Sequence, residues 1–79
     1  MKDFADKVAL ITGAGSGIGR ALSLELAEKG CNLALVDWNE DSLEETKQLL
    51  RKKNVAVSTH AFDISDKEKL KELEVAANQ

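Results

Sequence analysis

Two apolar runs without polar alternation occupy the first half of the chain, over residues 8–11 and 33–36. Apolar runs this short, each ending at a turn or a charge, are typical of strands that are covered on both faces of a parallel sheet. We therefore expect two buried parallel strands here. A third strand is expected over residues 55–62, where an apolar start leads into a more polar stretch.

The segment between the first two strands has helical periodicity. Ile18, Leu22 and Leu26 recur every four residues, as in the buried stripe of a crossover helix, and Gly30 offers a stop before the next strand. Leu24 falls off this stripe, so we expect its side chain to be exposed.

A second helix is indicated by the charges at its two ends. Residues 39–42 supply capping oxygens and acidic groups, while three basic residues at 51–53 complement the opposite end of the helix dipole. Leu43, Thr46 and Leu50 are expected to form its inner face.

A third helix is expected to begin at Ser65. The spacing from Ser65 to Glu68 fits a capping box, in which each side chain bonds a backbone N–H of the other residue. Leu70 and Leu73 then continue at helical intervals.

This βαβαβα alternation predicts an α/β fold. Right-handed crossovers would place the strands side by side in the order 3-2-1, which is half of a doubly wound, Rossmann-like parallel sheet. The 79 residues contain no proline and no internal repeat, and we see no linker-like stretch. Residues 1–79 are therefore interpreted as one incomplete portion of such a domain, with no boundary inside it.

Charge and cysteine content exclude several other classes. Eleven Lys and Arg against 14 Asp and Glu give a net charge of -3, so nucleic acid and anionic membranes are not expected as partners. Cys31 is the single cysteine, expected as a small buried apolar residue, and His60 is expected on a strand surface, so we predict no disulfide and no metal site. The polar start and short apolar runs predict no secretory signal or membrane span, and a cytoplasmic location.

Four glycines follow the first strand directly: Gly13, Gly15, Gly17 and Gly19. Glycine at a strand-to-helix turn lets the backbone approach a pyrophosphate closely, and leaves the first helical N–H groups facing the phosphates. Ile18 stands where a G-x-G-x-x-G motif beginning at Gly13 would need its last glycine, and the Gly-Lys pair of a P-loop is absent.

The spacing that does fit is T-G-x-x-x-G-x-G, from Thr12 to Gly19. In this turn, and over residues 4–77 as a whole, the sequence resembles the short-chain dehydrogenase/reductase family. The resemblance implies that the turn holds the pyrophosphate of a dinucleotide, with Ser16 and the N–H of Ile18 near the phosphates or the ribose.

Asp37 ends the second strand, 18 residues beyond Gly19. This is close to the spacing of about 20 residues expected for the acid that accepts hydrogen bonds from the adenosine ribose. The resemblance implies NAD rather than NADP, because NADP-preferring members place a basic residue where Ser16 or Trp38 stands. Arg20 is expected to be a solvated residue of the first helical turn.

Asp63 and Ile64 follow the third strand, and the resemblance implies that they hold the edge of adenine. A strand-end aspartate that starts the next helix would look similar. Trp38 is compatible both with a wall of the adenine pocket and with a cap on the end of the sheet.

The family's chemistry, as the resemblance implies, is hydride transfer between NAD(H) and an alcohol or carbonyl substrate, with a tyrosine acid/base, a lysine and a serine. The chain contains no tyrosine. It is expected to carry the adenosine half of the cofactor site, no catalytic residue and no activity by itself, within a parent enzyme expected to be a homo-oligomer. A free-standing nucleotide-binding or regulatory module, and a piece of another Rossmann-like enzyme such as a methyltransferase, are the alternatives.

Overall fold

Strands and helices alternate along the chain. The computed structural model describes residues 7–77. The elements are β1 (Val8–Thr12), α1 (Gly17–Glu28), β2 (Asn32–Asp37), α2 (Glu40–Leu49), β3 (Val57–Ala61) and α3 (Lys67–Ala77). The predicted α/β alternation is confirmed, although β3 is shorter than the predicted residues 55–62.

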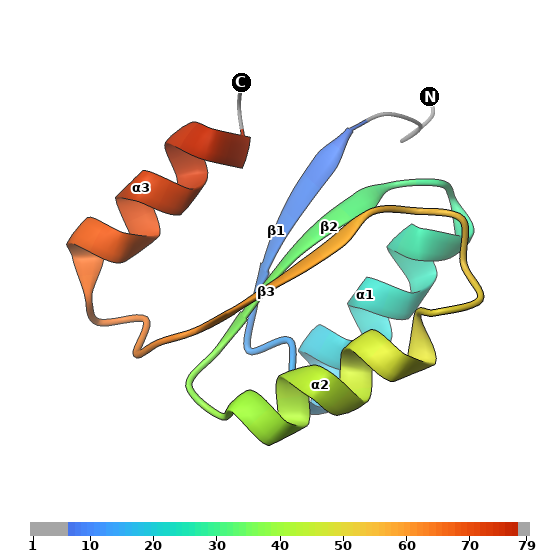
Figure 1. Cartoon of the computed structure of the whole chain (residues 1–79), viewed down its shortest axis with the longest axis horizontal. Helices are drawn as coiled ribbons and strands as arrows, with labels where there is room; N and C mark the ends of the chain where they lie inside the picture. Colours follow the sequence, from blue (N-terminus) through green and yellow to red (C-terminus); the bar gives the residue numbers. More distant parts are fainter. Residues whose placement is uncertain (1–6, 78–79) are drawn as a thin grey trace.

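The three strands form one parallel sheet arranged β1-β2-β3, so the central strand β2 pairs with both others (Figure 1). The expected order 3-2-1 has the same pairs of neighbouring strands, counted from the opposite edge of the sheet. Thr12 lies beside Val36, and Asp37 lies beside Ala61. This register brings the carboxyl ends of all three strands to one edge of the sheet, where the glycine turn also begins.

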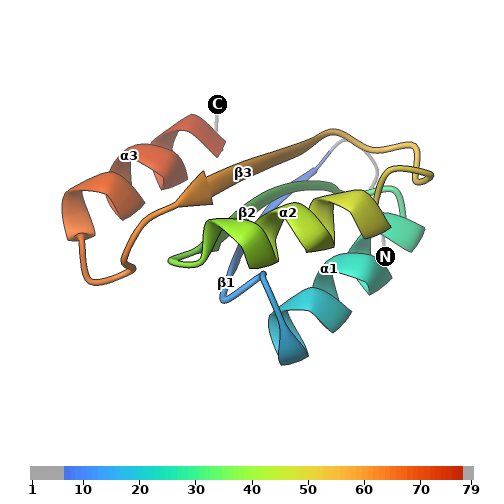
Figure 2. The same ribbon diagram turned by 60° about the horizontal axis from the view of Figure 1, so that its bottom comes forward.

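Helices lie on both faces of the sheet. α1 and α2 lie side by side on one face, and α3 lies on the other, where it contacts β1 (Figures 1 and 2). The four residues 33–36 of β2 are all buried, as predicted. The prediction that β1 is buried on both faces is wrong, because only Ile11 is buried in this strand and Val8 is 45% exposed. Among the described residues, β1 has a neighbouring strand on one side alone.

The predicted inner face of α1 is wrong at Ile18 and Leu22, whereas Leu26 packs against the core as expected. Ile18 is 88% exposed and Leu22 is 44% exposed, whereas Ser23 and Ala27 are buried. Leu24, which was expected in solvent, packs against the core. The small side chains of Ser23 and Ala27 let the helix approach the sheet closely, so the most hydrophobic stripe of α1 is not the one that faces the core.

The inner face and the cap of α2 are confirmed. Leu43, Thr46 and Leu50 are each no more than 2% exposed. The Asn39 side chain accepts a hydrogen bond from the Ser42 N–H at 3.0 Å, which satisfies one of the unpaired donors of the first turn.

The predicted start of α3 is wrong. The helix begins after Asp66, whose carboxylate accepts a hydrogen bond from the Lys69 N–H at 3.2 Å. The Ser65 N–H instead donates to the Asp63 carboxylate at 2.9 Å. Asp66, like Ser65, has a side-chain oxygen that can cap a helix, so the cap lies one residue later than predicted. Asp63 closes the turn that precedes the helix.

None of the helices within residues 7–77 has the length and apolar character that crossing a bilayer requires.

Candidate functional site

The glycine turn between β1 and α1 contains two residues in the left-handed region. Gly13 has φ of 65° and Gly17 has φ of 59°. A side chain is strained at such angles, so glycine is required there by backbone conformation. A Cβ atom at Gly17 would meet nothing within 4 Å, which leaves the space beside this position open.

Gly19 is required by packing. A Cβ atom there would lie 2.1 Å from the Gly13 carbonyl oxygen and 3.1 Å from the Ala14 Cα. The first turn of α1 therefore rests directly on the backbone of the glycine turn, and this contact sets where the helix begins relative to β1.

The Asp37 carboxylate ties the end of β2 to the glycine turn. Its Oδ2 accepts a hydrogen bond from the Gly15 N–H at 2.8 Å, and its Oδ1 accepts one from the Asn39 N–H at 3.1 Å. A Cβ atom at Gly15 would lie 2.8 Å from Asp37 Oδ2 and 2.6 Å from the Ser42 Cβ. The sequence assigned Gly15 only to the turn, whereas the structure shows that it allows Asp37 to approach the backbone.

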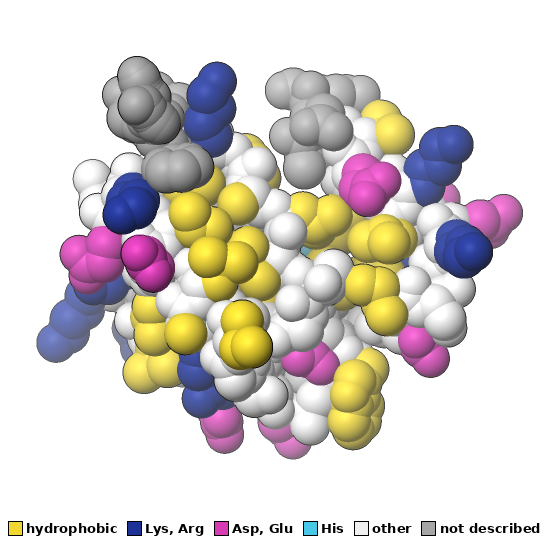
Figure 3. Space-filling model, turned by 180° about the vertical axis from the view of Figure 1, so that it is seen from behind, with side chains coloured by type: hydrophobic (Ala, Val, Ile, Leu, Met, Phe, Trp, Pro, Cys, Tyr) yellow, Lys and Arg dark blue, Asp and Glu magenta, His cyan; other side chains and the backbone are white. Residues whose placement is uncertain are grey.

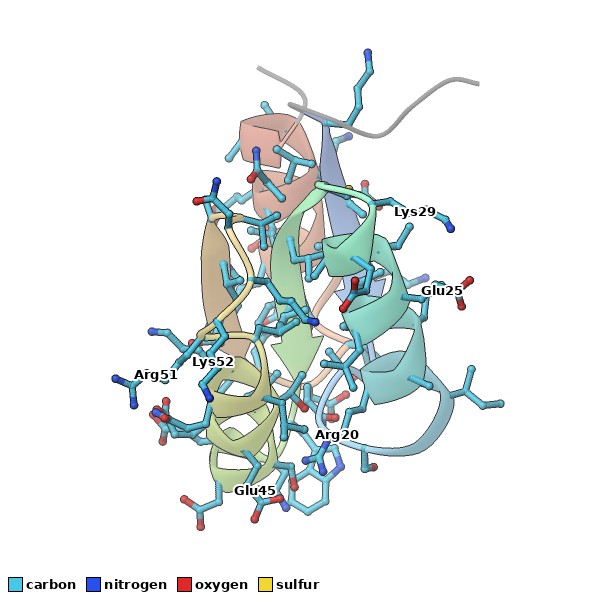
Figure 4. All side chains as sticks on the ribbon, turned by 90° about the vertical axis from the view of Figure 1, so that its right-hand side faces the viewer. Arg20, Glu25, Lys29, Glu45, Arg51 and Lys52 are labelled. Carbon is cyan, nitrogen blue, oxygen red and sulfur yellow. The ribbon has the colours of Figure 1, made fainter. Side chains whose placement is uncertain are left out.

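The expectation that Arg20 is solvated is wrong. Its side chain is 27% exposed and reaches across to α2, where it forms an ion pair with Glu45 at 3.1 Å. Figure 4 shows these two side chains turned toward each other, Arg20 from the first turn of α1 and Glu45 from the middle of α2. The Arg20 guanidinium also donates to Thr46 Oγ1 and to the Gly15 carbonyl oxygen. A guanidinium has five donors in a planar fork, which explains how one side chain serves several acceptors.

A pocket of about 280 Å³ opens at the carboxyl ends of the strands. It brings together five of the predicted site residues, which are Gly13, Asp37, Trp38, Asp63 and Ile64. Thr12, Val36 and Phe62 complete its lining. Trp38 lies on the wall of this pocket with 76% of its surface exposed.

A second hollow, of about 490 Å³, lies on the other side of the turn and shares Thr12 and Gly13 with the first. The predicted site residues Ser16, Ile18 and Gly19 also line it, together with Leu10, Ile11 and Leu22. Figure 3 shows apolar side chains at the surface on this side of the molecule. The predicted site residues Gly15 and Gly17 line neither space.

The Asp63 carboxylate is held by the residue that begins the next turn. Hydrogen bonds from the backbone N–H and the side chain of Ser65 lower the pKa of Asp63. This is the arrangement expected of a strand-end aspartate that starts a helix. Asp63 also lies in the wall of the 280 Å³ pocket, so its bonds to Ser65 do not remove it from the predicted site.

The lowered pKa of Asp63 predicts a loss of stability in acid. A carboxyl group with a lower pKa in the folded state stabilises the fold above its ordinary range near pH 4, and this contribution is lost as the pH falls through the folded-state value. We expect Asp63→Asn to flatten the dependence of the melting temperature on pH in this acid range. Glu74→Gln, which changes an exposed carboxylate of α3, is the matched control. Equal pH profiles for Asp63→Asn and the unmodified protein would contradict the assignment.

Cys31 and His60 line neither of these two spaces. Burial raises the pKa of the Cys31 thiol, which favours its protonated form. His60 Nε2 lies 2.9 Å from the Ser58 hydroxyl on β3. Across the described part of the chain, no three His, Cys, Asp or Glu side chains are grouped so that they could hold a metal ion.

A parallel sheet with a glycine turn at its carboxyl edge and an acid at the end of the next strand defines a class of nucleotide-binding fold. The family described as short chain dehydrogenase matches residues 7–79, and the chain belongs to this family. The chain is 43% identical over 70 residues to epidermal retinol dehydrogenase 2 of Mus musculus, covering 87% of this chain and 23% of that enzyme.

Two solved structures show the same fold. A short chain dehydrogenase/reductase from Burkholderia phymatum in complex with NAD matches with a TM-score of 0.86 and 40% identity, covering 98% of this chain and 27% of that one. NAD⁺-bound xylitol dehydrogenase matches with a TM-score of 0.85 and 34% identity, covering 99% of this chain and 32% of that one. The chain therefore spans between about a quarter and a third of these relatives.

Proposed function

We propose that residues 1–79 are the N-terminal portion of the NAD-binding domain of a short-chain oxidoreductase, and that this portion binds the adenosine and pyrophosphate groups of NAD(H). The observation that carries the proposal is the hydrogen bond between the Gly15 N–H and the Asp37 carboxylate. It joins the glycine turn to the acid at the end of β2, so that groups suited to phosphate and to ribose lie at one edge of the sheet.

The glycine turn fits a pyrophosphate. The first N–H groups of α1 have no acceptor within the helix, and they lie at the positive end of its dipole. The open space beside Gly17 leaves the backbone accessible to a ligand. Residues from Gly13 to Gly19, with Ser16 and the N–H of Ile18, would hold the phosphates.

The adenosine groups would occupy the 280 Å³ pocket. Asp37 would accept hydrogen bonds from the ribose hydroxyls, because a carboxylate retains acceptor capacity beyond its bonds to the Gly15 and Asn39 N–H groups. Asp63 and the N–H of Ile64 would hold the edge of adenine. Trp38 lies where it would wall the pocket.

The same carboxylate favours NAD over NADP. A 2′-phosphate carries nearly two negative charges and would lie at contact distance from Asp37, a repulsion of about 1 kcal/mol or more in a partly desolvated site. Neither Ser16 nor Trp38 supplies a balancing positive charge, and the Arg20 guanidinium is paired with Glu45.

Bound NAD(H) would supply the hydride chemistry, accepting a hydride from an alcohol or donating one to a carbonyl. The 79 residues contain no tyrosine that could act as the family's acid/base. We propose that this portion binds and orients the cofactor, and that the catalytic groups and the substrate site belong to other parts of the oxidoreductase.

Trp38 provides a direct test, because it is the single tryptophan and lies on the pocket wall. We expect NADH, NAD and ADP-ribose each to change its fluorescence saturably. Nicotinamide mononucleotide lacks the adenosine half and is the matched control ligand, for which no saturable change is expected. Absence of saturable binding of NAD by both fluorescence and calorimetry would contradict the proposed function.

A further inference from the structure

We propose that Arg20 and Thr46 are positioning residues for the cofactor, which hold the glycine turn against α2 so that its N–H groups face the phosphates. We call this pair the α1–α2 clamp. The inference rests on the proposed function and adds to it a role for α2. No α2 residue lines either of the two spaces at the turn, so the clamp would act on the cofactor through the turn alone.

Thr46 is the buried half of the clamp. It is fully buried on the inner face of α2, and its hydroxyl donates to the Ala14 carbonyl oxygen at 2.8 Å. The same hydroxyl oxygen accepts a hydrogen bond from Arg20 Nε at 2.9 Å. The single proton of this buried hydroxyl goes to Ala14, which leaves its lone pairs to accept from Arg20, so the two contacts depend on each other.

Arg20 is the charged half of the clamp. Its Nη2 donates to the Gly15 carbonyl oxygen, to the Ser42 carbonyl oxygen at 3.3 Å and to Glu45 Oε1 at 3.1 Å. Two of these three acceptors belong to α2, and the third belongs to the turn. The Glu45 carboxylate balances the charge of the guanidinium, which therefore serves as an anchor within the protein.

These contacts anchor three consecutive peptide groups of the turn, and the middle one, between Ala14 and Gly15, is held at both ends. The Ala14 N–H donates to the Val36 carbonyl oxygen at 3.0 Å, and the Gly15 N–H donates to Asp37. The carbonyl groups of Ala14 and Gly15 point to Thr46 and Arg20. The peptide plane between Ala14 and Gly15 is thereby fixed at both ends by the protein itself, and the plane between Gly15 and Ser16 is held at its carbonyl by Arg20.

Peptide planarity turns this anchoring into an orientation of the phosphate donors. In a trans peptide the N–H points away from the C=O of the same plane. Because the Gly15 carbonyl points to Arg20, the Ser16 N–H of the same plane points away from the Arg20 guanidinium. The clamp would therefore preorganise the first of the donors that meet the pyrophosphate.

The test compares NAD with adenosine, which has no phosphate. We expect Arg20→Met to weaken NAD binding by about tenfold, as for the loss of an oriented hydrogen-bond donor, and to change adenosine binding less than about twofold. Arg20→Lys keeps the charge beside Glu45 but loses the planar fork, so its loss of NAD affinity should be intermediate.

Thr46→Val should weaken NAD binding, and Thr46→Ser, which restores the hydroxyl, should recover it. Glu44→Gln, on the exposed face of α2, is the matched control and should behave as the unmodified protein.

The outcomes separate the clamp from the proposed function. If the unmodified protein binds no NAD, the proposed function fails and this inference fails with it. If it binds NAD and the folded Arg20 and Thr46 variants bind it equally well, the clamp alone is overturned. Equal weakening of NAD and adenosine would also overturn it, because a general structural defect does not distinguish phosphate from ribose. Without ligand, we expect the Ser16 amide to exchange faster in Arg20→Lys and in Thr46→Val than in the unmodified protein. Its exchange rate should be unchanged in Glu44→Gln. An unchanged rate in both Arg20→Lys and Thr46→Val would contradict the clamp.

Discussion

Gly19→Val is expected to destabilise the fold by about 3 kcal/mol or more and to abolish NAD binding. A Cβ atom at this position would lie 2.1 Å from the Gly13 carbonyl oxygen and 2.7 Å from the Gly13 carbonyl carbon. These are backbone atoms, which cannot move aside as the end of a flexible side chain can. The helix would have to shift relative to the turn, and its first N–H groups would lose their alignment with the phosphate site.

Chemical unfolding monitored by circular dichroism measures this loss of stability. Ala21→Val is the matched control, because it enlarges a small residue at an exposed position of the same helix. It is expected to lower the free energy of unfolding by about 0.5 kcal/mol. Retention of both stability and NAD affinity in Gly19→Val would contradict the close contact between α1 and the turn.

Gly17→Val tests the effect of backbone conformation at the same turn, without the steric clash that Gly19→Val introduces. The added Cβ atom has open space, but a valine at φ of 59° is strained by about 1–3 kcal/mol. Its branch would enter the space proposed for the pyrophosphate, so cofactor binding should be lost. Affinity for NAD kept within about threefold in the folded variant would remove Gly17 from the proposed phosphate site.

Asp37→Ala is expected to erode the preference for NAD. Loss of hydrogen bonds between a charged carboxylate and the ribose should weaken NAD binding by about 10- to 100-fold. NADP should gain relative to NAD, because the repulsion of its 2′-phosphate is removed. The ratio of the two dissociation constants, measured for the variant and for the unmodified protein, is the quantity to compare.

Asp37→Asn divides the two roles of this side chain. An amide oxygen can still accept the hydrogen bond from the Gly15 N–H, so the turn should keep most of its stability while the negative charge is lost. Asp41→Ala, which removes an exposed acid in the first turn of α2, is the control and should leave the cofactor preference unchanged. Equal affinity of the unmodified protein for NAD and NADP would contradict the role proposed for Asp37.

Several features could be predicted from the sequence because local physics dictates them. The uninterrupted apolar residues 33–36 become the buried central strand β2, because burying apolar side chains removes them from water. The same pattern over residues 8–11 becomes β1, which is only partly buried. Asn39 caps α2 and Leu43 packs beneath it, because capping chemistry and helical periodicity act over a few residues. The glycine-rich turn after β1 could also be predicted, and the structure adds that Gly13 and Gly17 have positive φ.

Tertiary structure decided which helical face is buried. The strongest apolar stripe of α1, at Ile18 and Leu22, lies at the surface, and the small Ser23 and Ala27 face the sheet. Hydrophobicity ranks side chains by the free energy of transfer from water, whereas the approach of a helix to a sheet also depends on side-chain volume. A stripe of small residues from Gly19 through Ser23 to Ala27 is present in the sequence and is the signal that hydrophobic periodicity overlooks.

The anchoring of the turn also depended on tertiary structure. Arg20 and Thr46 are separated by 26 residues, and no local pattern relates a first-turn arginine to a threonine on the next helix. Their hydrogen bond exists because α1 and α2 pack side by side on one face of the sheet. The cap and the inner face of α2 depend on residues close together in the chain and could be predicted from the sequence. The partners of Arg20, Gly15 and Asp37 were decided by the packing of elements that are distant along the chain.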